Sequence, residues 1–211
     1  MRVGFYYVGD IPEYRYLGGV AAAVCKNTMP EAEIVHLTDK HTKAIDGVDS
    51  VIRMERDCPM AVFRMRHHQA DGDWLFIDVD VLVLKDVSDV FNDSFDIAIA
   101  SRVPGDGADG PAFSEMPHNM GVVFSRSPEF WKAAEKELLT YDDKAQHWMG
   151  DQLAVCRLIK RGKFDVKVVP GEKYNFPPRS EQTPTASIVH YKGRRKPWML
   201  SRAKHILQKD Y

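Results

Sequence analysis

The chain contains little cysteine and no long apolar run. Its three cysteines, Cys25, Cys58 and Cys156, are scattered over 211 residues without a CxxC spacing. This set argues against a disulfide framework and against a zinc site, and it is typical of proteins in a reducing compartment. No apolar stretch reaches the ~18 residues of a membrane-spanning helix, and the first residues have the pattern of a strand rather than of a signal peptide. We therefore expect a soluble, cytoplasmic protein.

The chain also lacks an excess of charge of either sign. It contains 29 basic and 30 acidic residues, which gives a formal net charge of -1. So balanced a charge gives no overall reason to expect a nucleic-acid or anionic-membrane partner. The hydrophobic content of 44% and the charged content of 28% are ordinary for a soluble globular protein. We expect residues 1–211 to form a single compact domain.

Short apolar strands alternate with helical segments along the chain. Strands are expected at residues 2–8, 33–37, 48–54, 74–77, 95–100, 121–125, 166–169 and 188–191. Helices are expected at residues 12–27, 61–70, 128–141, 149–160 and 201–208, and a long irregular loop at 101–118. This alternation predicts an α/β fold, in which helices cover both faces of a mixed, mostly parallel sheet.

Two aspartates, Asp78 and Asp80, lie inside the apolar segment WLFIDVDVLVL. In a continuous strand they would face the same side of the sheet, where two like charges repel unless a cation lies between them. Because such carboxylates are costly to bury, we expect that only a divalent metal compensates them. The alternative is a strand end with two solvated acids at a turn. The apolar residues that continue after Asp80 favour the metal site.

His190 opens the segment HYKGRRKPW, about 110 residues after Asp80. It follows a short apolar strand, so we expect it at a strand end. A lone histidine more often makes a structural hydrogen bond than binds a metal. Here Gly193 permits a close backbone approach, and Lys196 supplies a compact cation that suits a phosphate. These neighbours favour a role in a binding site.

Together the two segments resemble the Asp-x-Asp and His-x-x-Gly-x-x-Lys-Pro-Trp signatures of the family 8 retaining glycosyltransferases, which include glycogenin and bacterial lipopolysaccharide galactosyltransferases. The resemblance implies a GT-A fold, Mn2+ or Mg2+, a UDP-sugar donor (UDP-glucose or UDP-galactose first) and retention of the anomeric configuration. It implies that Asp78, Asp80 and His190 hold the metal. It also implies that Lys196, with Gly193 beside it, grips the diphosphate.

Two further pairs occur in the order that the family has. Asn119 and Gly121 in HNMGVVF resemble the family's Asn-x-Gly, near the transferred sugar, although both are also ordinary turn residues. Asp151 and Gln152 resemble its Asp-Gln pair near the anomeric carbon, although an acid there also favours a helix N-terminus. The resemblance implies catalytic roles for Asn119, Asp151 and Gln152. Whether Asp151 or Gln152 acts as a nucleophile, or braces a same-face attack, stays open.

Weaker signals point to the nucleotide. Arg64 and Arg66 precede the metal strand and are candidates for a nucleotide or phosphate contact. Tyr7 and Asp10 lie at the end of the first strand, and open α/β sheets bind ligands beyond the carboxyl ends of their strands. Tyr7 and Asp10 are therefore candidates for contacts with the base or the ribose.

The loop at residues 101–118 is expected to recognise the acceptor substrate. Its Asp106, Asp109, Phe113 and Glu115 suit hydroxyl hydrogen bonds and stacking against a sugar, which favours a carbohydrate acceptor. A solvated helix face explains the basic C-terminal segment better than a nucleic-acid partner does, and nucleic acid stays the lesser alternative.

Two other functions stay open at this point. A nucleotidyltransferase would make, rather than consume, a sugar nucleotide with a similar fold and metal site. Such enzymes usually carry a Gly-rich basic loop after the first strand, and the segment YVGDIPEYRYLGG fits that pattern poorly. A catalytically silent sugar-nucleotide-binding protein is the third class.

Overall fold

The computed structural model describes residues 1–103, 114–181 and 185–208. A seven-stranded sheet with the order β3-β2-β1-β4-β7-β6-β8 forms its centre. β7 runs antiparallel to β4 and to β6, whereas the other neighbours are parallel. The predicted mixed, mostly parallel sheet is therefore confirmed. Its strands are β1 (Arg2–Tyr6), β2 (Glu33–Asp39), β3 (Ser50–Met54), β4 (Trp74–Ile77), β6 (Ile97–Ser101), β7 (His118–Ser125) and β8 (Val166–Val169).

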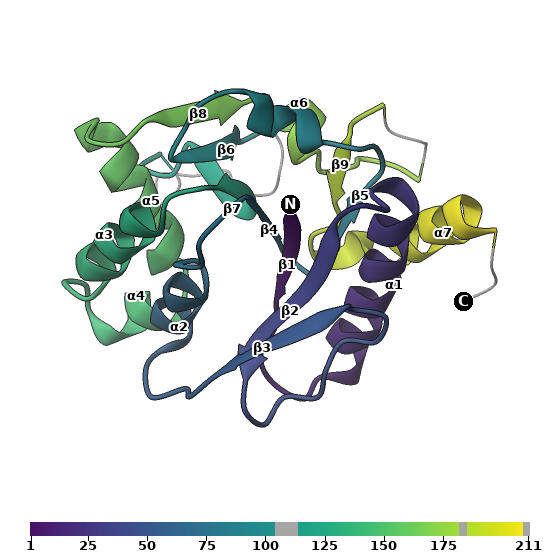
Figure 1. The fold of residues 1–211 in the computed structure, drawn as a ribbon, viewed down its shortest axis with the longest axis horizontal. Helices are drawn as coiled ribbons and strands as arrows, with labels where there is room; N and C mark the ends of the chain where they lie inside the picture. Colours follow the sequence, from purple (N-terminus) through teal and green to yellow (C-terminus); the bar gives the residue numbers. More distant parts are fainter. Residues whose placement is uncertain (104–113, 182–184, 209–211) are drawn as a thin grey trace.

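Helices form a layer on each face of this sheet. Figure 1 shows α1 and α7 on one side and α2, α3 and α5 on the other. The helices are α1 (Pro12–Thr28), α2 (Met60–His67), α3 (Pro128–Leu138), α4 (Asp143–His147), α5 (Gly150–Arg161), α6 (Gly171–Tyr174) and α7 (Lys196–Leu207), with the 3-10 turns η1 (Ser88–Asn92) and η3 (Gly193–Arg195). The short helices α4 and α6 were not predicted, because one turn of helix leaves no periodic pattern.

A second sheet pairs β5 (Val81–Val83) with β9 (Ile188–His190) in antiparallel orientation. The strand predicted at residues 74–77 is confirmed, and it does not continue through the aspartate pair, so Asp78 and Asp80 do not face one side of a single strand. β4 ends at Ile77, and the Val81 N–H donates to the Asp78 carbonyl at 3.2 Å across a turn. The apolar residues after Asp80 then enter the second sheet, so burial continues although the strand does not.

Two other boundaries differ from the prediction at functional motifs. β7 begins at His118 rather than at Gly121, because its first residues pair with β6, so Asn119 and Gly121 lie inside the strand. α7 begins at Lys196 instead of Ser201, because Pro197 suits the first turn of a helix. The lysine predicted to bind phosphate therefore stands at a helix start.

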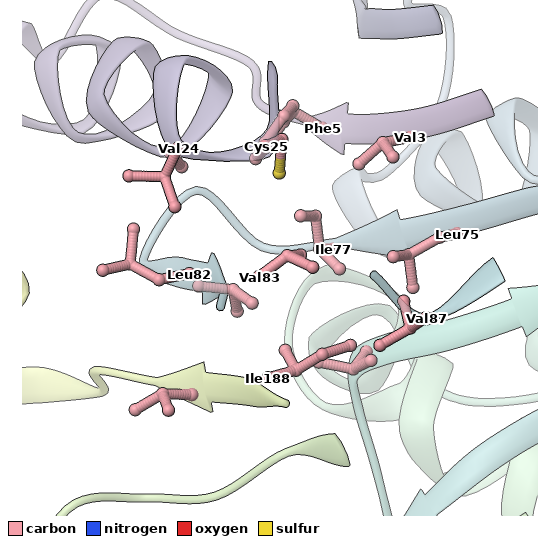
Figure 2. Packing of buried hydrophobic residues seen from close by; sticks show 14 of the residues in the cluster. Val3, Phe5, Val24, Cys25, Leu75, Ile77, Leu82, Val83, Val87 and Ile188 are labelled. Carbon is pink, nitrogen blue, oxygen red and sulfur yellow. The ribbon is translucent and has the colours of Figure 1, made fainter. Parts of the chain in front are cut away.

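The strand side chains alternate between two apolar cores. In β4, Leu75 and Ile77 pack on the α1 face, and Trp74 and Phe76 pack on the face of α2, α3 and α5. Figure 2 shows the first core, where residues of β1, β4 and α1 face Leu82, Val83 and Ile188 of the second sheet. This packing places the second sheet beside the end of β4 and fixes the turn that carries the aspartates.

The carboxyl ends of β1 and β4 share one edge of the main sheet with the amino end of β7. Phe5 lies beside Ile77, and Ile77 lies beside Val122 in the antiparallel pair. Polar residues that follow β1 and β4, or begin β7, therefore meet at the edge where open α/β sheets bind ligands.

Cys25, Cys58 and Cys156 are all free, and Cys25 and Cys156 are buried. Of the helices in the three described ranges, none has the length and apolarity needed to cross a membrane.

Candidate active site

Two separate strand pairings bring Asp78, Asp80 and His190 together. The Asp78 N–H donates to the Gly121 carbonyl at 3.1 Å, which extends the pairing of β4 with β7. Val81, directly after Asp80, pairs with His190 in the second sheet. Each of the three side chains offers one ligand atom, and these atoms lie within 4.8 Å of one another. The proximity of the two distant motifs is thus determined by backbone hydrogen bonds.

The two carboxylates have different partners. The His190 Nε2 atom lies 3.1 Å from Asp80 and 3.7 Å from Asp78. Burial alone would raise the pKa of Asp80, but its neighbours His190 and Lys196 hold it below its ordinary value. Asp78 instead accepts a hydrogen bond of 2.9 Å from Arg64. The expectation that only a metal compensates the pair is therefore wrong, because the protein supplies its own cations.

The donor set fits a divalent cation. Two carboxylates and one imidazole are ligands that suit Mn2+ or Mg2+, with substrate oxygens to complete the shell. Gly121 leaves the space in which the His190 ring lies. A Cβ atom on Gly121 would stand 2.5 Å from the His190 Nδ1 and closer still to Cε1. The structure shows that Gly121 makes room for the His190 ring, and its predicted contact with the donor stays a prediction.

Arg64 links two acids across the cleft. From α2 it donates to Asp78 at 2.9 Å, to the Met120 carbonyl at 2.8 Å and to Asp151 at 3.5 Å. Burial alone would lower the pKa of Arg64, but Asp78 and Asp151 raise it. Arg66 instead pairs with Glu135 and Asp57, so of the two arginines only Arg64 is placed by the structure at the cleft.

The side chains of Asn119 and Gln152 are hydrogen-bonded to each other. The Gln152 Oε1 atom accepts from the Asn119 amide at 3.4 Å and from the Met120 N–H at 3.3 Å. Asp151 precedes it in the first turn of α5, where its carboxylate accepts from the Gln152 N–H at 2.8 Å. The predicted catalytic residues are therefore brought together, with Asp151 also held by Arg64.

A cleft of about 1170 Å³ opens over these groups. Besides Arg66, two predicted site residues, Asp10 and Lys196, are absent from its described lining. The Lys196 Nζ atom lies 4.9 Å from the ring centroid of Tyr14, which does line the cleft. The predicted residues that line it are Tyr7, Arg64, Asp78, Asp80, Asn119, Gly121, Asp151, Gln152, His190 and Gly193.

Tyr7 lines the cleft, but its hydroxyl already has partners. It donates to the Ile11 carbonyl at 3.0 Å and accepts from the Ile11 N–H at 2.7 Å. These bonds stabilise the connection between β1 and α1. They therefore give Tyr7 a structural role that requires no bound ligand. Its predicted contact with the nucleotide stays a prediction, as does that of Asp10, which is exposed.

Only one of the residues expected to recognise the acceptor lies in the described part of the structure. Asp106, Asp109 and Phe113 lie outside the described residues, and Glu115 pairs with Arg157 at 3.3 Å. An aromatic residue that no sequence motif marked, Trp148, also lines the cleft, and its exposed fraction is 76%.

Asn175 is the second residue that the sequence analysis missed. It directly follows α6, is 4% exposed, and its Oδ1 atom lies 3.0 Å from the His190 Nδ1. No motif marks it, because an asparagine near two prolines has the pattern of an ordinary turn.

Comparisons with solved structures identify the fold of the chain, whereas comparisons of its sequence find no relative. No family model matches the sequence, and no curated protein matches it. The solved structure of galactosyltransferase LgtC, in complex with donor and acceptor sugar analogs, has a TM-score of 0.67 and 16% identity, over 99% of this chain and 95% of that chain. Glycosyltransferase GlyE of Streptococcus pneumoniae TIGR4 has a TM-score of 0.60 and 16% identity, over 98% of this chain and 63% of that chain.

A third solved structure is a glycosyltransferase involved in the glycosylation of the major capsid of PBCV-1. It has a TM-score of 0.61 and 13% identity, over 99% of this chain and 100% of that chain. These likenesses establish that the chain has the GT-A fold of these glycosyltransferases. Membership of family 8 stays a prediction.

Proposed function

We propose that this chain is a metal-dependent retaining glycosyltransferase, which moves a hexose from a UDP-sugar to a hydroxyl group of a carbohydrate. One observation carries the proposal: Asp78, Asp80 and His190 meet in a cleft at the ligand-binding edge of a GT-A sheet. UDP-galactose and UDP-glucose are the first donors to test, and the likeness to the galactosyltransferase LgtC supports the former.

The diphosphate belongs beside the metal ligands. A divalent cation held by Asp78, Asp80 and His190 would neutralise the negative charge that develops on the diphosphate leaving group. Lys196 supplies a second positive charge near Asp80, and this charge lowers the pKa of that carboxyl. Gly193 has a φ of 60°, a backbone conformation that allows the chain to turn closely at the cleft.

The hexose belongs beside Arg64, Asp151 and Gln152. Arg64 binds both Asp78 and Asp151, so it fixes the metal carboxylate relative to the carboxylate nearest the sugar. The Gln152 Oε1 atom is occupied by Asn119 and by a backbone N–H. Its Nε2 group donates one hydrogen to the Met116 sulfur at 3.4 Å, and its second hydrogen can donate to a sugar oxygen. Asp151 then acts either as a nucleophile or as a brace for attack on the same face.

An exposed aromatic side chain supports a carbohydrate acceptor. Trp148 lines the cleft two residues before the start of α5, and 76% of its surface is exposed. The following Met149 has a φ of 67°, which turns the chain sharply into that helix. A flat apolar ring with a polar edge suits the face of a sugar ring better than it suits a phosphate.

Calorimetry with UDP, in the presence and absence of Mn2+, tests the proposal first. We expect UDP to bind measurably only with Mn2+, and UDP-galactose or UDP-glucose to be hydrolysed slowly when no acceptor is present. Glycan acceptors should then accelerate release of UDP from the better donor. Asp89→Asn, an exposed acid on η1, is the matched control for substitutions of the metal ligands.

Each alternative gives a different result in the same assays. Binding of UDP with Mn2+ but no turnover of any sugar nucleotide would indicate a silent binding protein. Formation of a UDP-sugar from UTP and a hexose 1-phosphate would indicate a nucleotidyltransferase. Absence of metal-dependent UDP binding would contradict the proposal as a whole.

A further inference from the structure

Hydrogen bonds whose donors and acceptors can be assigned link Gly121 to His190 through Asn119 and Asn175. The Gly121 N–H donates to the Asn119 side chain at 3.0 Å. Because a backbone N–H can only donate, the accepting atom is the amide oxygen of Asn119. The Asn175 side chain lies 2.9 Å from this same oxygen. The Asn175 atom at this contact must therefore be its NH2 group.

The orientation of Asn175 determines which nitrogen of His190 carries hydrogen. With its NH2 group directed at Asn119, Asn175 presents its oxygen to His190 Nδ1 at 3.0 Å. An amide oxygen only accepts, so Nδ1 must donate. In a neutral imidazole the lone pair then lies on Nε2. Nε2 is the nitrogen that faces Asp80 at 3.1 Å and Asp78 at 3.7 Å.

Backbone contacts hold Asn175 in this position. Its own N–H donates to the Gly171 carbonyl at 2.9 Å, which closes the turn of α6. The next residue, Phe176, donates to Ile188 at 3.1 Å and accepts from the His190 N–H at 2.9 Å. The exposed fractions of Asn175 and His190 are 4% and 3%. Water therefore competes little for either side chain.

We propose that Asn175 is a positioning residue, which holds His190 with hydrogen on Nδ1 and so presents the Nε2 lone pair to a divalent cation. This inference rests on the metal site of the proposed function. Hydrogen bonds to the outer nitrogen of a metal-binding histidine orient the ring and select the nitrogen that binds. Here an amide, itself oriented by Asn119, supplies that hydrogen bond.

Two variants with Mn2+ as the probe test the role of Asn175. Asn175→Leu keeps a similar size but removes the acceptor, and we expect Mn2+ affinity in the presence of UDP to fall about 10–100-fold. Asn175→Asp keeps an acceptor for Nδ1–H, so its affinity should lie well above that of Asn175→Leu. Asn92→Leu, an exposed asparagine on η1, is the matched control and should bind Mn2+ as the wild type does. Electron paramagnetic resonance measures the free Mn2+.

A spectroscopic measurement decides the matter if Asn175→Leu does not fold. The imidazole nitrogens of the wild type, labelled with 15N and loaded with Mg2+ and UDP, report which nitrogen carries hydrogen. His190→Gln identifies the signal of this ring among the 8 histidines. We expect hydrogen on Nδ1.

The outcomes separate this inference from the proposed function. Wild-type Mn2+ affinity in Asn175→Leu, or hydrogen on Nε2 in the loaded wild type, would overturn the role of Asn175 and leave the proposed function standing. A wild-type protein that binds neither Mn2+ nor Mg2+ would overturn both.

Discussion

The His190 ring packs directly against Gly121, so closely that a side-chain methyl group at position 121 would overlap the ring. A Cβ atom on Gly121 would stand 2.5 Å from the His190 Nδ1, the nitrogen that faces Asn175. The same glycine accepts from the Asp78 N–H and donates to Asn119. One residue of β7 therefore makes room for one proposed metal ligand and holds the backbone of another.

We predict that Gly121→Ala destabilises the fold and abolishes Mn2+ binding, because the His190 ring must move. Overpacking of this kind costs about 1–3 kcal/mol, and each kcal/mol lowers the melting temperature of a chain of this size by about 2–4 °C. Thermal unfolding and Mn2+ titration measure the two effects. Gly19→Ala in α1 is the control, since its nearest new contact is 3.4 Å. Wild-type Mn2+ affinity in Gly121→Ala would contradict the assignment of His190.

Asp78→Asn and Asp80→Asn should each abolish Mn2+-dependent binding of UDP while the chain stays folded. Each substitution keeps the shape of the side chain and removes a charged ligand. In Asp78→Asn, Arg64 still has Asp151 as a partner, which limits the loss of stability. Calorimetry with UDP and Mn2+ measures the effect, and Asp89→Asn should bind normally. If either site variant kept the wild-type affinity, the metal assignment would be wrong.

Arg64→Met should destabilise the protein far more than Arg66→Met, although both arginines lie on α2. Loss of Arg64 leaves Asp78 and Asp151, which are 32% and 13% exposed, without their shared partner. Breaking a fully buried ion pair costs about 3–5 kcal/mol, so we expect a smaller loss for this partly buried pair. The Arg66 side chain is itself more exposed, at 32% against 13% for Arg64, and pairs near the surface contribute about 0–1 kcal/mol. Urea unfolding measures both. If both variants lost the same free energy of unfolding, Arg64 would not form its ion pairs with Asp78 and Asp151 in solution.

Lys196→Ala should weaken the binding of UDP much more than that of uridine. A lost charge-assisted contact with a phosphate costs on the order of 1.5–3 kcal/mol. Calorimetry with both ligands makes the comparison, and Lys204→Ala, on the same helix, is the control. Equal weakening of UDP and uridine would instead assign Lys196 a structural role, consistent with its position over the Tyr14 ring.

Stability should fall as the pH drops from about 6.5 to about 4. Burial lowers the pKa of His36 and of His67 from 6.5 to about 4. Between these values the unfolded chain binds more protons than the folded chain, so acid favours unfolding. Each histidine contributes about 1.4 kcal/mol per pH unit within this window. Urea unfolding between pH 7 and pH 4 should show a shallower slope for His67→Gln than for His147→Gln, an exposed control. Equal slopes would refute the prediction.

Local sequence determined the elements whose pattern is complete in a few residues. The apolar run of residues 74–77 predicted β4 with its observed bounds, because four consecutive buried side chains need no distant information. Pro12 and Pro128 marked the starts of α1 and α3, since the proline ring suits the first helical turn. The residue types of the candidate site were equally visible, because carboxylates, imidazole and ammonium groups carry their chemistry wherever they lie.

Only the tertiary structure decided how these groups are combined. Asp80 and His190 meet because β5 pairs with β9, and a pairing between strands so far apart in the chain leaves no local pattern. Arg64 rather than Arg66 reaches the cleft because the packing of α2 selects one face of the helix. The place of Asn175 depends on hydrogen bonds from three segments, which form only when the sheets are assembled. Sequence thus determined element types and chemical groups, whereas long-range packing determined which groups share a site.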